Sequence, residues 1–106
     1  MNLQQIADKL DFDLEDVQML MDMFISDTLK SLSEVEQHIA LNNKTELRNI
    51  AHGIKGSASN LMLEEVTQIA LEIENLAKDV IEADYKSLFE DLKQNIKTLE
   101  REKEEA

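Results

Sequence analysis

The sequence predicts an all-α fold, an antiparallel up-and-down four-helix bundle preceded by a short N-terminal helix. Three observations support this prediction. The 106 residues include no proline and only 2 glycines, too few for the frequent turns of a β-sandwich or barrel. Residues with high helix propensity dominate the composition. Apolar residues recur at spacings of three and four along nearly the whole chain. All-β and α/β folds are therefore excluded.

The first predicted helix is short and is followed by a much longer one. Asp11 and Asp13 interrupt the apolar pattern between them, and Asp13 with Asp16 resembles a capping box that starts the second helix. The stripe of the first helix comprises Leu3, Ile6, Ala7 and Leu10. The stripe of the second continues in one phase and comprises Val17, Leu20, Met21, Phe24, Thr28, Leu32, Val35 and Ile39. We therefore expect one uninterrupted second helix of about six turns.

The third predicted helix begins after a pair of asparagines. Asn42 and Asn43 end the second helix, and Asn43 with Glu46 provides the next cap signature. We expect Asn60 to end the third helix, because asparagine tolerates the left-handed conformation. The apolar stripe comprises Leu47, Ile50, Ala51, Ile54, Ala58 and Leu61.

Two more amphipathic helices complete the chain. The stripe of the fourth comprises Val66, Ile69, Ala70, Ile73, Leu76, Ala77 and Val80. The stripe of the fifth comprises Tyr85, Leu88, Phe89, Leu92, Ile96 and Leu99. The charged run at 101–105 is interpreted as a solvated, fraying helix end. Links of a few residues make consecutive helices pack antiparallel, and with no linker or repeat we expect residues 1–106 to form one domain.

Charge and cysteine content exclude several classes of function. The net charge of −12 disfavours nucleic acid and anionic membranes as partners. The absence of cysteine excludes disulfides, thiolate metal sites and a cysteine nucleophile. The N-terminus lacks the features of a signal peptide, and no apolar run is long enough to span a bilayer. We expect a cytoplasmic domain that binds other proteins.

One segment departs from this acidic background. No carboxylate occurs between Glu46 and Glu64, and the segment contains Arg48 and Lys55. Both glycines of the chain also lie here, inside a predicted helix, although each costs roughly 1 kcal/mol relative to alanine. Such costs one turn apart indicate that something must approach the backbone closely.

His52 lies at the centre of this segment, on the face opposite the apolar stripe. Gly56 and Ser59 share its face, and Arg48 and Lys55 flank it. An exposed neutral imidazole beside two cations is suited to accept a phosphoryl group. The absence of nearby carboxylates in the sequence also fits, since an acidic neighbour would repel phosphate. A surface histidine with no chemical role is the alternative interpretation.

The second histidine has neither glycine nor lysine near it. His38 lies in the acidic stretch 34–38, so we interpret it as structural surface.

The segment 51–61, which contains the other histidine, resembles the signature of histidine-containing phosphotransfer (HPt) domains, His-x-x-Lys-Gly-Ser followed by small residues. His52, Lys55, Gly56 and Ser57 match it in register, and the helix order extends the resemblance over essentially all 106 residues.

The resemblance implies a carrier function rather than an enzyme. His52 would accept a phosphoryl group on its outer ring nitrogen, from a receiver-domain aspartate or a sensor kinase, and pass it to the aspartate of a response-regulator receiver. Lys55 would face the phosphate, and Gly56 would keep the approach open. From their positions on the same helix, we also expect Arg48 and Ser59 to support the site. The receiver would supply Mg²⁺, and this chain would bind no metal or cofactor. Since one acceptor site needs no second subunit, we expect a monomer.

One departure from the family pattern concerns the backbone. Met62 stands where many members have a glycine, at the turn from the third helix into the fourth. Gly53 is not required by the pattern.

Two other functions fit the same fold. The chain could be the phosphoacceptor domain of a chemotaxis-type kinase, or a helical interaction module that is never phosphorylated. A carboxylate-bridged metal site is excluded, because the sequence has no Glu-x-x-His motif.

Three residues of the second helix lie outside its core stripe. Met19 and Met23 could form a docking surface, with Ile25 on the other flank. We favour the interpretation that the methionines pack under the first helix.

Overall fold

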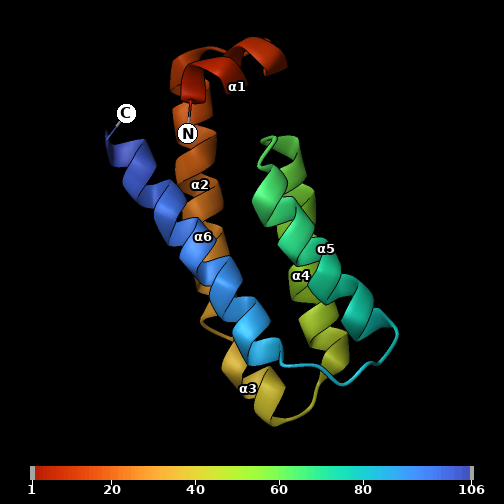
Figure 1. The fold of residues 1–106 in the computed structure, drawn as a ribbon. Coiled ribbons are helices and arrows are strands. Elements are labelled where there is room, and N and C mark those ends of the chain that lie inside the picture. Colours follow the sequence, from red (N-terminus) through yellow and green to blue (C-terminus); the bar gives the residue numbers. More distant parts are fainter. Residues whose placement is uncertain (1, 106) are drawn as a thin grey trace.

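The computed structural model describes residues 2–105, with side chains to Lys103. This part of the chain is entirely helical apart from short links (Figure 1). Its six helices are α1 (Leu3–Leu10), α2 (Leu14–Leu32), α3 (Val35–Ala40), α4 (Lys44–Asn60), α5 (Glu64–Lys78) and α6 (Tyr85–Glu105). The all-α prediction is confirmed.

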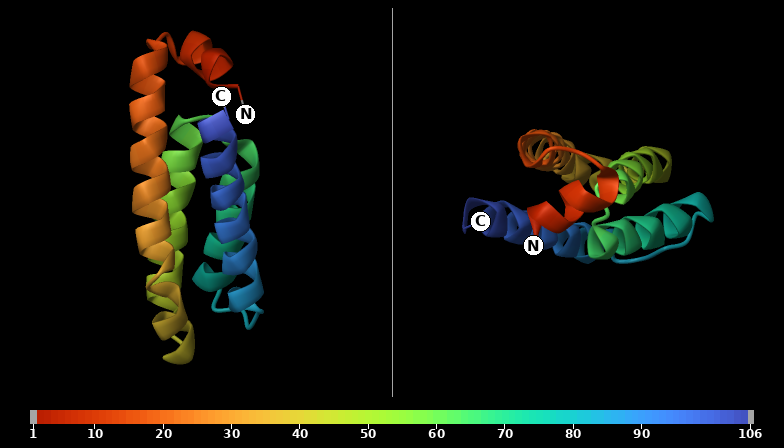
Figure 2. Two further views of the ribbon diagram at one scale, coloured as in Figure 1. Left: turned by 90° about the vertical axis from the view of Figure 1, so that its left-hand side faces the viewer. Right: turned by 90° about the horizontal axis from the view of Figure 1, so that it is seen from above.

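The helices form a bundle around one apolar core. Helix α4 packs along α5, α5 contacts α6, α6 contacts α2, and α2 contacts α4. The bundle measures 42 × 21 × 16 Å, and α1 lies across one end of it (Figure 2). The largest fully buried side chains all belong to the predicted stripes: Val17, Met21, Leu47, Ile73, Leu92 and Ile96. None of the helices in residues 2–105 is long and apolar enough to cross a membrane.

The second predicted helix is not continuous. Helix α2 ends at Leu32, and α3 begins at Val35 after a turn. The Ser33 hydroxyl donates to the carbonyl of Lys30 over 2.6 Å, a local bond of the kind that competes with the helical hydrogen-bond ladder. Ser33 and Glu34 still have right-handed angles. The apolar residues of α2 and α3 therefore stay on the same side of the chain across the break, and Val35 remains buried.

The C-terminal end of α4 differs from the prediction that Asn60 adopts the left-handed conformation. Asn60 is the last helical residue, and Met62 has a φ of 61°. The N–H of Leu63 donates to the carbonyl of Ala58, and that of Met62 donates to the carbonyl of Ser59, both over 3.0 Å. This is the Schellman arrangement, which satisfies the last carbonyls of a helix. Met62 thus adopts the conformation that glycine adopts most easily.

Three other helices end with the same type of hydrogen bond, in which a backbone N–H donates to the carbonyl five residues earlier. Their left-handed residues are Asp11, Asn42 and Val80, with φ of 57°, 53° and 57°. Val80 therefore lies outside α5 and is 68% exposed, so its assignment to the apolar stripe is wrong. At the helix starts, Asn43 caps α4 through the N–H of Glu46, as predicted, whereas the Asp13 side chain forms no cap hydrogen bond.

The C-terminal segment is more ordered than the sequence suggested. Helix α6 continues to Glu105 instead of fraying after Leu99. Lys103 is only 22% exposed and forms an ion pair with Asp22 of α2. The opposite charge on α2 fixes this part of α6, and the sequence alone does not reveal that partner.

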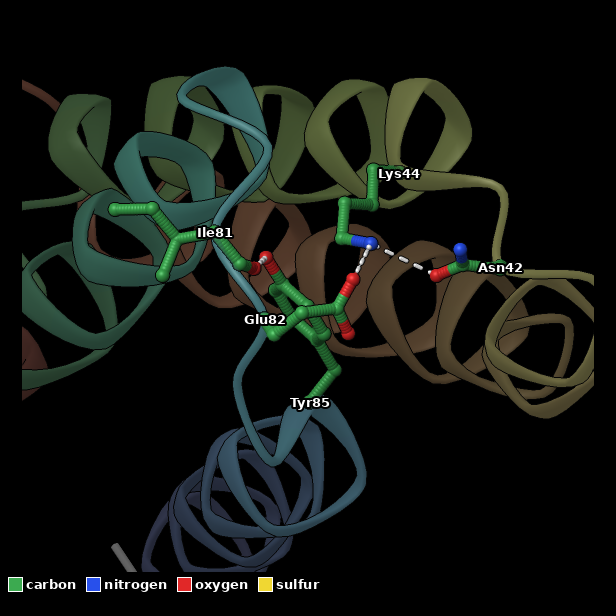
Figure 3. A network of polar contacts seen from close by, with 5 residues as sticks. All are labelled: Asn42, Lys44, Ile81, Glu82 and Tyr85. Carbon is green, nitrogen blue, oxygen red and sulfur yellow. Dashed lines mark hydrogen bonds and ion pairs between the residues drawn. The ribbon is translucent and has the colours of Figure 1, made fainter.

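The link between α5 and α6 is tied to the start of α4 by a buried lysine (Figure 3). The Lys44 side chain is 8% exposed, and its Nζ lies 2.7 Å from Oε1 of Glu82 and 2.8 Å from Oδ1 of Asn42. The Tyr85 hydroxyl donates to the carbonyl of Ile81 over 2.5 Å. These bonds join the start of α4 to the link between α5 and α6, at the end of the bundle opposite α1.

Candidate functional site

Helix α4 directs His52 away from the core. Ala51, Ile54 and Ala58 are buried on one side of the helix, and His52 lies outside that buried stripe. Its side chain is 68% exposed, which confirms the orientation predicted from the helical wheel. Gly56 is also exposed on this surface.

A carboxylate from the neighbouring helix contacts both His52 and Lys55. Oε1 of Glu74, on α5, lies 2.9 Å from Nδ1 of His52, and Oε2 lies 2.7 Å from Nζ of Lys55. The Glu74 side chain is only 12% exposed. The expectation that no carboxylate lies near His52 is therefore wrong. Although this stretch of α4 has no acidic residue of its own, α5 supplies one next to His52.

Glu74 is held in its ionised form. The hydrogen bond from Lys55 lowers the pKa of the Glu74 carboxyl below its ordinary value near 4.5, burial opposes this shift, and His52 adds to it. At neutral pH the carboxylate is therefore an acceptor only. Nδ1 of His52 must then carry a proton and donate it, which leaves the lone pair on the outer nitrogen, Nε2.

The remaining predicted site residues are all on α4. Lys55 is 27% exposed, and its Nζ forms an ion pair with Glu74. Arg48 is exposed one turn before His52, beside a surface depression that Lys78 of α5 also lines. Ser59 is exposed near the end of the helix. The structure therefore groups His52 and Lys55 around Glu74, while Arg48 and Ser59 lie farther along α4.

The two glycines of α4 leave open space. A β-carbon added to Gly53 or Gly56 would have nothing within 4 Å, and neither residue has a positive φ. The helix therefore does not need glycine at these positions for its backbone or its internal packing. The open space is available to a molecule that approaches from outside.

Sequence reasoning missed Glu74, although a signal was present. Glu74 is one turn from Ala70 and from Ala77, both buried residues of the α5 stripe. A carboxylate at such a position must be buried, and a buried carboxylate needs a cationic or hydrogen-bonding partner. Lys55 and His52 are the partners that α4 supplies.

The methionine surface also differs from the favoured interpretation. Met19 and Met23 are 55% and 54% exposed rather than packed under α1, and Phe12 is 49% exposed. Ile25, in contrast, is buried. Met23 and Phe12 line a hollow of about 510 Å³ between α2 and the end of α4. Leu10 of α1 lines the same hollow.

Comparison with known families gives one match. A family model described as Hpt domain matches residues 19–102, which is most of the chain. No curated protein and no solved structure matches the sequence. The match includes the segment that contains His52 and the whole of α5.

Proposed function

Since this chain belongs to the Hpt domain family, we propose that His52 is its phosphoacceptor. Hpt domains are histidine phosphotransfer modules of phosphorelays and interact with receiver domains of response regulators. One observation supports His52 most strongly. Its side chain is 68% exposed, and its Nδ1 is bound by a buried, ionised carboxylate.

Transfer onto the domain exchanges one bond to phosphorus for another. The Nε2 lone pair attacks the phosphorus of a receiver's aspartyl phosphate, the N–P bond forms, and the bond to the aspartyl oxygen breaks. The donor aspartate leaves as a carboxylate. Nδ1 of His52 keeps its proton throughout, so the ring becomes positively charged, and Glu74 lies 2.9 Å away to balance that charge.

The onward step reverses these events on a second receiver. Its aspartate attacks phosphorus, the N–P bond breaks, and a neutral imidazole returns with the proton still on Nδ1. Glu74 thus acts as a positioning residue that fixes the tautomer and ring orientation in both directions.

Lys55 has two functions in this proposal. It holds Glu74 in place through the ion pair at 2.7 Å, and its partly exposed ammonium group adds positive charge near the incoming phosphoryl group. Arg48 and Ser59 support the bound phosphate from positions farther along α4. Gly56 leaves open space for the partner's phosphorylated aspartate.

The accompanying Mg²⁺ belongs to the receiver in this proposal, and the Hpt chain acts as carrier and substrate without a cofactor of its own.

We further propose that α2, α4, α5 and α6 constitute an antiparallel up-and-down four-helix bundle, supported by the closed series of contacts among these helices. Residues 1–106 would act as one monomeric, cytoplasmic domain.

The decisive test uses two routes of phosphorylation. The purified protein is incubated with a phosphorylated receiver and Mg²⁺, and separately with phosphoramidate, a small donor that requires no docking. Acid-labile, base-stable phosphate is expected on the wild type and on the His38→Gln control, and not on His52→Gln. The circular dichroism of His52→Gln should match the wild type, because the side chain is 68% exposed. Equal labelling of His52→Gln would refute the assignment, and no labelling of any variant would indicate an interaction module.

A further inference from the structure

A second surface feature lies next to His52 and has no function in the transfer chemistry described above. A groove of about 380 Å³ runs between α2 and α4. Gly53, the residue after His52, forms part of its wall. Because successive helix residues are 100° apart, the groove opens on the α2 side of the imidazole. Glu74 and Lys55 contact each other on the α5 side.

The groove combines two apolar side chains and several uncharged polar ones, among them Ser31, Asn49 and Ser57, with one acidic group. Ile50 and Ile54 contribute apolar surface, and Asp27 contributes a carboxylate. No lysine, arginine or histidine lines it. Asp27 is exposed and forms no ion pair with a residue in the described range 2–105. An apolar stem that ends in a cation would match these groups, because lysine and arginine bury their methylenes while the charged end stays polar.

Thr28 adds a hydroxyl group to the groove. Its side chain lines the groove and the residue is 4% exposed. Thr67 and Thr98 each donate to a carbonyl one turn earlier in their helices. Thr28 makes no side-chain hydrogen bond to a residue of the described range. The Thr28 hydroxyl is not among the buried polar atoms that lack a partner, so it is open to the groove and can accept a hydrogen bond from a polar group bound there.

We propose that this groove receives a lysine or arginine side chain of the receiver domain that docks on His52. The inference rests on the proposed function and adds the chemistry of the partner's contact. Gly53 leaves the space for the side chain, Asp27 pairs with its charge, and Thr28 offers it a hydroxyl acceptor.

The proposal also gives the docked receiver one orientation. The Lys55 ammonium group, paired with Glu74, lies on the α5 side of His52, and the carboxylate of Asp27, unpaired within the described range, lies on the α2 side. A receiver whose acidic phosphorylation site faces Lys55 and whose basic residue faces Asp27 complements both groups. Complementary charges of this kind fix the register of an interface and raise its association rate.

The test measures transfer from the phosphorylated domain to a receiver. His52 is first loaded with phosphoramidate, and kcat/KM is then measured with the receiver that reacts fastest among those encoded in the same genome. Asp27→Asn should lower kcat/KM about fivefold at low salt, and the difference should vanish in about 1 M salt. Asp91→Asn, which removes an exposed carboxylate on α6, is the matched control and should change kcat/KM by less than about twofold.

Two further variants examine the space and the partner's charge. Gly53→Leu fills the groove and should slow transfer about tenfold or more, while its loading by phosphoramidate stays at the wild-type rate. Asp27→Lys should slow transfer further. Changing the receiver's basic contact residue to glutamate should restore the rate of Asp27→Lys.

The outcomes separate this inference from the function on which it rests. Loading of His52 with equal kcat/KM for Asp27→Asn, Gly53→Leu and wild type would overturn the groove proposal and leave the phosphoacceptor assignment intact. Failure of His52 to become labelled by either donor would overturn both. Slower transfer for Asp27→Asn but not for Asp91→Asn, with unchanged loading, would support the groove proposal.

Discussion

Replacing Glu74 by glutamine removes one negative charge at the centre of the site, and with it the ion pair to Lys55. The amide oxygen of glutamine can still accept the hydrogen bond from Nδ1 of His52, which spans 2.9 Å in the wild type. The negative charge that would balance a phosphorylated ring is lost. Glu74→Gln therefore tests the electrostatic part of the mechanism separately from ring orientation.

The size of the effect follows from the geometry. The ring charge and the carboxylate charge are about 4 Å apart, which corresponds to about 1 kcal/mol in water and about 4 kcal/mol at a typical protein surface. Because the His52 side chain is 68% exposed, a value near the lower end, about 1–2 kcal/mol, applies. The rate of phosphorylation by phosphoramidate should fall about 5- to 30-fold.

The same variant has a second, pH-dependent readout. The folded state holds the pKa of Glu74 below its ordinary value. Its contribution to stability is therefore present above that ordinary value and is lost as the pH falls through the folded-state pKa. At neutral pH, Glu74→Gln should cost about 1 kcal/mol, or about 4–8 °C in Tm. The difference in Tm should shrink as the pH is lowered below about 4.

A matched control isolates this position. Glu72→Gln removes an exposed carboxylate two residues away on the same helix, and it should alter neither the rate nor the pH dependence of Tm. A Glu74→Gln protein that is phosphorylated as fast as wild type would refute the reasoning about ring charge. A Tm difference that stays constant from pH 7 to pH 3 would refute the reasoning about the ionised carboxylate.

Three further predictions concern stability and approach to the site. Val80→Gly should raise stability by about 1 kcal/mol, because a β-branched residue with φ 57° is strained and its side chain is largely exposed; an unchanged or lower melting temperature would contradict this. Gly56→Ala should raise stability by about 1 kcal/mol yet slow transfer from a receiver, and a wild-type transfer rate would remove the steric argument. Glu82→Ala should cost about 1–2 kcal/mol by leaving a buried ammonium short of a partner, whereas Lys44→Met should cost less than about 1 kcal/mol; denaturant unfolding of both variants would detect a reversal of this order.

Much of the fold could be predicted because apolar spacing determines which side of each helix is buried. The stripe of α4 placed Ala51, Ile54 and Ala58 inside and His52 outside, as the structure has them. The break at Ser33 escaped prediction because the turn keeps right-handed angles and leaves the apolar phase intact. A pattern of period 3.6 cannot detect such a break.

The candidate site was harder to predict than the fold, because its members come from two helices. His52 and Lys55 are neighbours on α4, so a local motif contains both. Glu74 is 22 residues from His52 along the chain, and only the packing of α5 against α4 brings its carboxylate to the imidazole. The stretch of α4 without acidic residues was identified correctly. The inference that no carboxylate lies near His52 in space was wrong. Met62 and Val80 show the same limitation for the backbone, since their left-handed angles follow from helix-end hydrogen bonds rather than from residue type.

The attachment of one edge of the His52 ring to Glu74 has a kinetic consequence for the proposed relay. With a single reactive nitrogen on a single face, the domain can engage only one receiver at a time. Donor and acceptor must therefore alternate, and steady-state velocities should follow a ping-pong rate law with parallel double-reciprocal plots. The dephosphorylated donor should then compete with the acceptor for the loaded carrier. Signal flux would depend on how quickly each spent partner dissociates, as well as on the rate at which the phosphoryl group moves.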